Sequence, residues 1–222
     1  RGLLFGGMIF ASALVLSFSR ASVLNVLVAT TVLIYLHRPR IRLARFFALA
    51  AGAGLAGIIV LRALLPAFTE AYWMRLSNSV AYLFTATEGL LSGRVASWRT
   101  VLGFLVDHPW HALFGIGYKT LPYSDYLGRT VITDNMYLSL LAETGIVGLG
   151  AMLWLSLQIL RSAHRAARSP DPRHSFFGSW IFAFWAGEIV QMFSGDLLTY
   201  WRVMPLYLWV LAVAVRHEHP VS

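Results

Sequence analysis

The residues best suited to chemistry lie between positions 93 and 148, where a polar segment leads directly into a long apolar run. Arg94 stands near the start of this segment, Asp134 and Asn135 stand directly before the apolar run, and Glu143 lies inside it. Charge this close to an apolar run of membrane-spanning length is costly, so it usually serves a function there. These four residues are the first candidates for a site.

Arginine is well suited to binding a phosphate or diphosphate, because its planar guanidinium donates two parallel hydrogen bonds and stays charged. Arg94 is the first candidate for this contact, and Arg20, in a short polar turn between two apolar runs, is the second. The alternatives are a solvated or headgroup contact for Arg94 and an interfacial anchor for Arg20. Because a preorganised cation also stabilises developing charge, Arg94 is predicted to be catalytic as well.

Asp134 is the candidate general base, since a carboxylate in a suitable environment can take the proton from an attacking hydroxyl. The alternative is that Asp134 or Asn135 caps the helix that follows, because both residue types favour the N-cap position. The two roles are compatible, because a capping carboxylate can still face a cavity.

Glu143 and Asn135 are predicted to support the site rather than to react. Glu143 lies about 13 Å along the helix that follows Asn135, at a rise of 1.5 Å per residue. An acid at that depth is expected to face protein or water and to pair with an arginine. We therefore predict an ion pair in which Glu143 orients Arg94 or Arg20.

Neither a metal ion nor an organic cofactor is predicted. The chain has no cysteine and no Asp-x-Asp pair, and His108 and His111 are separated by Pro109 with no third ligand in sight. The sequence His108-Pro109 instead predicts the end of a helix.

The composition indicates what must position these residues. Of the 222 residues, 58% are hydrophobic and only 13% are charged, which predicts a polytopic α-helical membrane protein. The net charge is +8, but the basic residues are scattered between apolar runs, which argues against nucleic-acid binding and predicts contacts with the lipid bilayer. We expect one transmembrane domain over residues 1–222, the C-terminal part of a longer protein. About six transmembrane helices are predicted, at residues 3–18, 21–36, 46–65, 136–160, 176–193 and 197–215.

The basic turns at residues 38–45 and 161–173 are predicted to be cytoplasmic. Alternation through the spans then places Arg20 and the long loop at residues 66–134 on the opposite, periplasmic side. A loop of this length is rarely a passive connector. Within it, residues 98–106 predict an interfacial helix that ends at the His108-Pro109 stop.

The order and spacing of several motifs around this loop resemble the C-terminal half of the O-antigen ligase and polymerase superfamily. The motifs are Ser19-Arg20, Gly93-Arg94 with Trp98, His108-Pro109, Gly115-Ile-Gly117, Asp134-Asn135 with Leu138, and Glu143-Thr144-Gly145 with Gly148. The resemblance implies a multi-pass enzyme of the bacterial inner membrane. It implies transfer of glycan from an undecaprenyl-diphosphate carrier to a saccharide acceptor on the periplasmic face, without a cofactor.

One departure from the family pattern bears on the substrate. In the ligases the residue before the asparagine is usually histidine, whereas here it is Asp134. This favours a polysaccharide polymerase, or a relative with a different acceptor, over lipid A–core ligation. A transporter or lipid-carrier flippase without covalent chemistry is the main alternative, and a scaffold for other assembly enzymes is the third.

Overall fold

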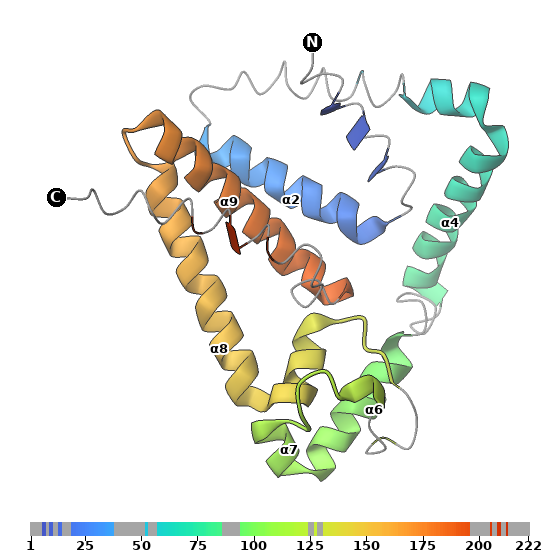
Figure 1. Ribbon diagram of the computed structural model, residues 1–222. Helices are drawn as coiled ribbons and strands as arrows, with labels where there is room; N and C mark the ends of the chain where they lie inside the picture. The colour runs from blue at the N-terminus through green and yellow to red at the C-terminus, as the bar shows by residue number, and fades with distance from the viewer. Residues whose placement is uncertain are drawn as a thin grey trace. The chain divides into compact units, whose positions relative to one another are not determined.

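The computed structural model describes residues 6–7, 9–10, 13–14, 19–37, 52, 57–85, 94–123, 127, 131–195, 205, 208–209 and 212. All regular secondary structure in these ranges is helical, which confirms the predicted all-α class (Figure 1). The chain divides into two compact units, one formed by residues 1–36 and 97–222 and the other by residues 37–96.

The first unit is built on α8 (Met136–Ala167) and α9 (Pro172–Gln191), which are both long and apolar enough to cross a membrane. A tight turn joins them, and the carboxylate of Asp171 caps α9 by accepting hydrogen bonds from the first-turn amides of Arg173 and His174. The two helices pack through Ile159, Ala163, Ile181 and Trp185. The predicted span at residues 176–193 is thereby confirmed as a helix that starts one turn earlier.

α2 (Arg20–Leu36) lies alongside α9 (Figure 1). Gly187 permits this close approach, because a Cβ atom there would lie 2.2 Å from Oδ1 of Asn25. The side-chain amide of Asn25 donates hydrogen bonds to Oε1 of Glu188, at 3.0 Å, and to Oε1 of Gln191. Glu188 is only 5% exposed, and its Oε2 has no hydrogen-bond partner among the described residues. A small polar cluster therefore ties α2 to α9.

We expect Asn25→Leu to destabilise this helix pair by about 1–3 kcal/mol, because it removes the donor from the buried Glu188 carboxyl and from Gln191. Thermal unfolding in detergent, followed by tryptophan fluorescence, measures the effect. Thr31→Val is the matched control, since Thr31 is exposed on the same helix and its hydroxyl bonds only within that helix.

A double variant, Asn25→Leu with Glu188→Leu, separates the hydrogen bond from simple packing. The double variant removes the buried carboxyl together with its donor and leaves only Gln191 without this donor, so it is expected to be more stable than Asn25→Leu alone. If Asn25→Leu unfolds at the same temperature as Thr31→Val, the polar cluster contributes nothing to the packing of α2 on α9.

α8 is not one continuous helix. Gly145 has φ 71° and ψ −174°, which separates a helix at residues 136–144 from a second one at residues 146–167, and the bend is visible in Figure 1. The predicted span at residues 136–160 starts where α8 starts, at Met136, but it is interrupted at Gly145. Glu143 precedes the break and does not lie 13 Å down a continuous membrane helix.

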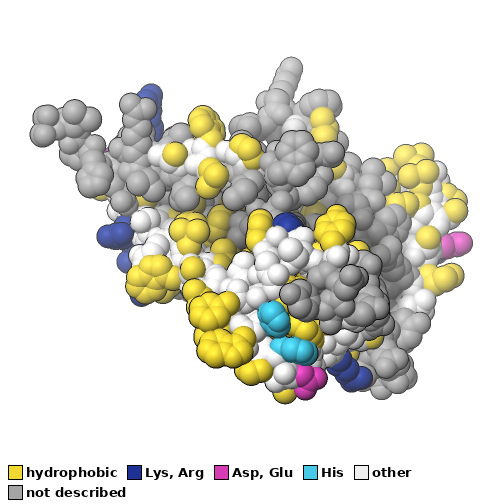
Figure 2. Space-filling view, turned by 60° about the horizontal axis from the view of Figure 1, so that its bottom comes forward, with side chains coloured by type: hydrophobic (Ala, Val, Ile, Leu, Met, Phe, Trp, Pro, Cys, Tyr) yellow, Lys and Arg dark blue, Asp and Glu magenta, His cyan; other side chains and the backbone are white. Residues whose placement is uncertain are grey.

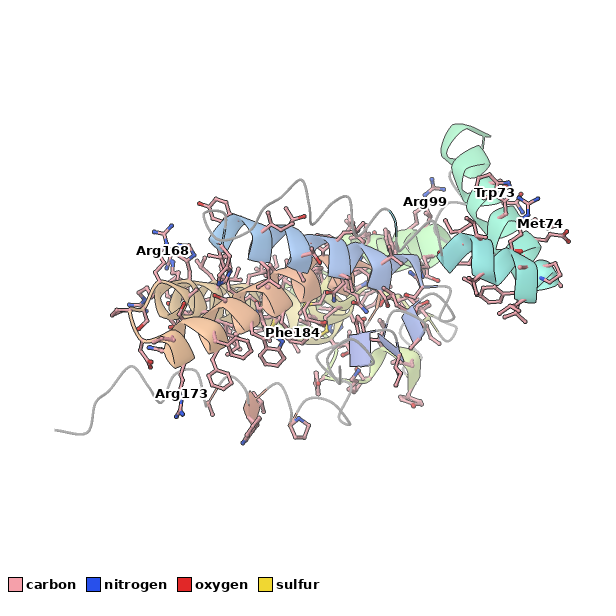
Figure 3. All side chains as sticks on the ribbon, turned by 90° about the horizontal axis from the view of Figure 1, so that it is seen from above. Trp73, Met74, Arg99, Arg168, Arg173 and Phe184 are labelled. Carbon is pink, nitrogen blue, oxygen red and sulfur yellow. The ribbon has the colours of Figure 1, made fainter. Side chains whose placement is uncertain are left out.

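The second unit contains a bent pair of helices. A helix at Gly57–Leu64 ends before Pro66, as predicted, because proline lacks the amide hydrogen needed to continue it. α4 (Pro66–Thr85) follows at an angle of 116° and exposes Trp73 and Met74 (Figure 3). The sequence had placed this segment in the external loop and did not predict α4.

Among the described residues, two helices are long and apolar enough to span a membrane, or three if the bent pair counts as one span. The predicted span at residues 21–36 is present as the shorter apolar helix Ala21–Leu36. Most of the predicted spans at residues 3–18, 46–65 and 197–215 lies outside the described residues, so the count of six stays a prediction.

Candidate functional site

The later part of the long predicted loop folds together with the first helix of α8 into a compact structure that we call the cap, defined as residues 97–123 and 131–144. It contains most of α6 (Arg94–Asp107), all of α7 (Pro109–Phe114) and η1 (Leu121–Tyr123), and the first helix of α8. Its core is formed by Val101, Phe104, Leu105, Leu121, Val131, Leu138 and Ala142. The helix predicted at residues 98–106 is confirmed, and it begins four residues earlier, at Arg94.

Trp98 fastens α6 to the chain segment that precedes α8. Its indole Nε1 donates a hydrogen bond to the carbonyl oxygen of Thr133, at 2.7 Å. The Thr133 hydroxyl is buried, donates to the carbonyl of Asn135 at 3.2 Å, and shares a hydrogen bond with the Ser139 hydroxyl. Because these groups are satisfied inside the cap, they fix the backbone on both sides of Asp134.

Asn135, rather than Asp134, is the N-cap of α8. Its Oδ1 accepts a hydrogen bond from the Leu138 amide at 3.1 Å, and the residue is buried. Asp134 has a left-handed backbone with φ 45°, which aspartate tolerates better than most residues, and its side chain is exposed. Of the two residues predicted to cap the helix, Asn135 is the one that does so. The Asp134 carboxylate lies at the protein surface.

Arg94 is the first residue of α6 and is half-buried. It precedes Trp98 by four residues and Val101 by seven, so helical geometry places all three on one face of α6. Arg94 therefore lies on the same face of α6 as Trp98, whose indole donates a hydrogen bond to the Thr133 carbonyl. Arg20 is the first residue of α2, and its side chain lies outside the described residues.

The carboxylate of Glu143 is buried in the cap and accepts two backbone hydrogen bonds. Its Oε2 accepts from the Lys119 amide at 2.9 Å and its Oε1 from the Leu121 amide at 3.3 Å. The main chain adds two further bonds, from Ile116 to the carbonyl of Ala142 and from Gly117 to that of Glu143. The loop after α7 is therefore joined to the end of the first α8 helix.

Two glycines make this junction possible. Gly115 has φ 80°, and a Cβ atom on it would lie 2.2 Å from the carbonyl oxygen of Glu143. Gly145 has φ 71°, and a Cβ atom on it would lie 2.1 Å from the carbonyl oxygen of Leu113. Both positions require glycine for conformation and for space. The Gly-x-Gly motif and the Glu-Thr-Gly motif thus form one backbone contact.

Both carboxylate oxygens of Glu143 accept from backbone amides, and these partners were not predicted. An ion pair of Glu143 with Arg94 or Arg20 stays a prediction. Nothing in the sequence showed that the amides of Lys119 and Leu121 would converge on this carboxylate.

We expect Glu143→Gln to lower the stability of the cap by about 1–3 kcal/mol, because one of the two loop amides then faces an NH2 group and loses its acceptor. Glu143→Ala removes both acceptors and is expected to cost more. The midpoint of thermal unfolding in detergent measures both variants. Asp107→Asn, at an exposed acid of the same cap, is the control, and the prediction fails if Glu143→Gln melts with it.

His108 and His111 lie against an aromatic residue of α6. Their rings stack against Phe104, and Nδ1 of His108 lies 3.0 Å from the Phe104 carbonyl oxygen. α6 ends at Asp107 and α7 starts at Pro109, which confirms the predicted helix stop. Within the described residues, no group of three or more possible protein ligands could hold a metal ion.

A shallow apolar hollow of about 450 Å³ lies at the turn between α8 and α9. It is lined by Pro172, Arg173, Phe176 and Phe177, and the Arg173 side chain points away from the helices (Figure 3). It lies at the end of α9 opposite Gln191, far from the cap. None of the predicted site residues lines it.

These features define the class of protein: an α-helical membrane protein in which apolar helices carry a compact helical cap with arginine and carboxylate side chains. A family model described as O-antigen ligase matches residues 5–153, about two thirds of the chain, and the chain belongs to this O-antigen ligase family. The predicted resemblance is confirmed, and membership implies a membrane glycan ligase or polymerase. No curated protein and no solved structure matches the chain.

Proposed function

We propose that the protein is a glycosyltransferase that moves glycan from a polyprenyl diphosphate carrier, undecaprenyl diphosphate, to a saccharide acceptor at the periplasmic face of the inner membrane. The observation that carries this proposal is the Trp98–Thr133 hydrogen bond. It ties the helix that begins with Arg94 to the residue directly before Asp134. Two motifs that are far apart in the sequence are thereby joined by one contact.

In the proposed reaction, an acceptor hydroxyl oxygen attacks the anomeric carbon of the donor sugar. The bond between that carbon and the diphosphate oxygen breaks, and the electron pair leaves with the lipid diphosphate. Arg94 and Arg20 bind the diphosphate and stabilise the charge that develops on it. Asp134 takes the proton from the attacking hydroxyl.

The structure supports the assignment of Asp134 in two ways. Asn135 satisfies the amide at the start of α8, so the Asp134 carboxylate is not needed as the cap. The Asp134 side chain is also exposed, so a saccharide hydroxyl has access to it. Asn135 and Glu143 are assigned as positioning residues, because they fix the backbone of the cap rather than face the substrate.

Reconstitution tests this proposal. Purified protein in proteoliposomes is supplied with undecaprenyl-diphosphate-linked repeat units, and products are analysed by gel and mass spectrometry. New glycosidic linkages are expected, with a large loss of rate in Asp134→Asn but not in Asp107→Asn. Translocation of the carrier without new linkages would instead establish the transporter.

The same assay separates polymerase from ligase. A polymerase lengthens the glycan on the carrier when no other acceptor is present, whereas a ligase needs an added saccharide acceptor. The presence of Asp134 in place of the usual histidine favours the polymerase. If the protein were only a scaffold, replacing Arg20, Arg94 and Asp134 together by uncharged residues would leave its function intact.

A further inference from the structure

Four large apolar side chains are exposed on α6 and α7. They are Leu102 and Val106 on α6 and Trp110 and Phe114 on α7, and we call them the apolar row. Val106 is 80% exposed and Trp110 is 74% exposed, and the Trp110 and Phe114 rings stack with their centroids 6.3 Å apart. Figure 2 looks at this end of the molecule and shows hydrophobic side chains at the surface beside the cyan histidines.

α6 is apolar on two sides, which is unusual for a helix bordered by water. Val101, Phe104 and Leu105 fill the core of the cap, so the packing of the cap does not account for Leu102 and Val106 on the other side. α7 has no buried residue at all. A contiguous exposed patch of large apolar side chains marks a surface that something apolar covers.

The row continues into the transmembrane part of α8. The backbone of Leu113, in the last turn of α7, meets Gly145 at the break in α8. The helix after the break begins with Ile146 and Val147, which are both exposed. α7 therefore lies directly against the point where the helix at residues 146–167 begins.

α8 as a whole is long and apolar enough to cross a membrane, but its part after the break is shorter. From Ile146 this part runs through 15 residues before the first charged residue, Arg161. At 1.5 Å per residue that is about 22 Å, against a hydrocarbon core of about 30 Å. Where this part alone crosses the core, further apolar surface is needed beyond Ile146, and the adjoining apolar row provides it.

A basic residue, Arg99, lies beside the apolar row on α6. It is exposed and precedes Leu102 by three residues and Val106 by seven, so it lies on the same side of α6. Its side chain points away from the helix (Figure 3). An arginine at the edge of an apolar surface extends its guanidinium to lipid phosphates while its stem stays in apolar surroundings, and tryptophan also prefers this zone.

We propose that the apolar row inserts into the lipid leaflet at the cap end of α8, with Arg99 at the level of the phosphates. The occupant of this surface is the bilayer itself. α6 and α7 then lie along the membrane surface, and the opposite face of α6, which packs into the cap, is held at the height of the headgroups. This inference does not depend on the catalytic assignment.

Site-directed spin labelling tests the proposal, because the chain has no cysteine of its own. Val106→Cys and Phe114→Cys are each labelled with a nitroxide in proteoliposomes of phosphatidylcholine and phosphatidylglycerol. Collision rates with oxygen, which enters lipid, and with a nickel chelate, which stays in water, are measured by EPR. Both labels are expected to favour oxygen, whereas the control label at Asp107→Cys, an exposed acid outside the row, is expected to favour nickel.

A second measurement does not require a label. In vesicles that contain phosphatidylcholine brominated along its acyl chains, the tryptophan fluorescence of the unmodified protein is quenched. Trp110→Phe is expected to lower the quenched fraction. Labels at Val106 and Phe114 that favour nickel would overturn the proposal. Labels shielded from both reagents would also overturn it, because the row would then be covered by protein.

Discussion

The Gly145→Ala variant is expected to lose the folded cap, at a cost of about 3 kcal/mol or more. Gly145 combines positive φ with extended ψ, a conformation in which alanine is strained by about 1–3 kcal/mol. The alanine methyl group would also lie 2.1 Å from the Leu113 carbonyl oxygen, where only a shift of the backbone could make room. Four backbone amides of the loop donate hydrogen bonds in this register, two to main-chain carbonyls and two to the Glu143 carboxylate, and these bonds are expected to be lost together.

Hydrogen exchange measures this loss directly. The Lys119 and Leu121 amides are bonded to Glu143, so they should exchange slowly in the native protein and rapidly in Gly145→Ala. Gly150→Ala is the matched control: it lies five residues further along α8, where a Cβ atom meets nothing within 4 Å. If the Lys119 and Leu121 amides exchange as slowly in Gly145→Ala as in the native protein, the close contact between Gly145 and Leu113 is not required for the fold of the cap.

Arg94→Lys is expected to reduce the rate of glycan transfer by about 10²–10³-fold, because lysine keeps the charge but loses the planar pair of donors. The protein should still fold, since Arg94 is the first residue of α6 and Trp98 is unchanged. The initial rate of linkage formation in proteoliposomes is the measurement, with the melting temperature recorded in parallel.

Arg99→Lys is the matched control for that variant. It lies five residues further along the same helix, on the exposed side, and is expected to retain the activity of the unmodified protein. An Arg94→Ala variant with full activity would remove Arg94 from the proposed mechanism.

Local sequence signals predicted much of the cap. His108-Pro109 gave the end of α6, because proline constrains the residue before it. Asn135 before an apolar run gave the start of α8, because its side chain caps the first turn. Such signals depend on neighbours in the chain, so one sequence is enough to interpret them.

The break at Gly145 could not be predicted in this way. Residues 136–160 are mostly apolar, and Glu143 is the only charged residue among them, so they resemble one long helix. At the break, the backbone of Gly145 lies directly against the carbonyl of Leu113, which is more than thirty residues earlier in the chain. The partners of Glu143 were missed for the same reason, since backbone amides carry no signature in the sequence.

The junction between the loop and α8 also constrains how this family can vary. The carbonyls of Ala142 and Glu143 would bond within a continuous helix, but after the break they accept from Ile116 and Gly117. The loop after α7 thus supplies the donors, and the end of the first α8 helix supplies the acceptors. An insertion or deletion in either segment would move these donors and acceptors out of register. Among homologues, Gly115 and Gly145 should therefore be inherited as a pair, while changes in length accumulate elsewhere.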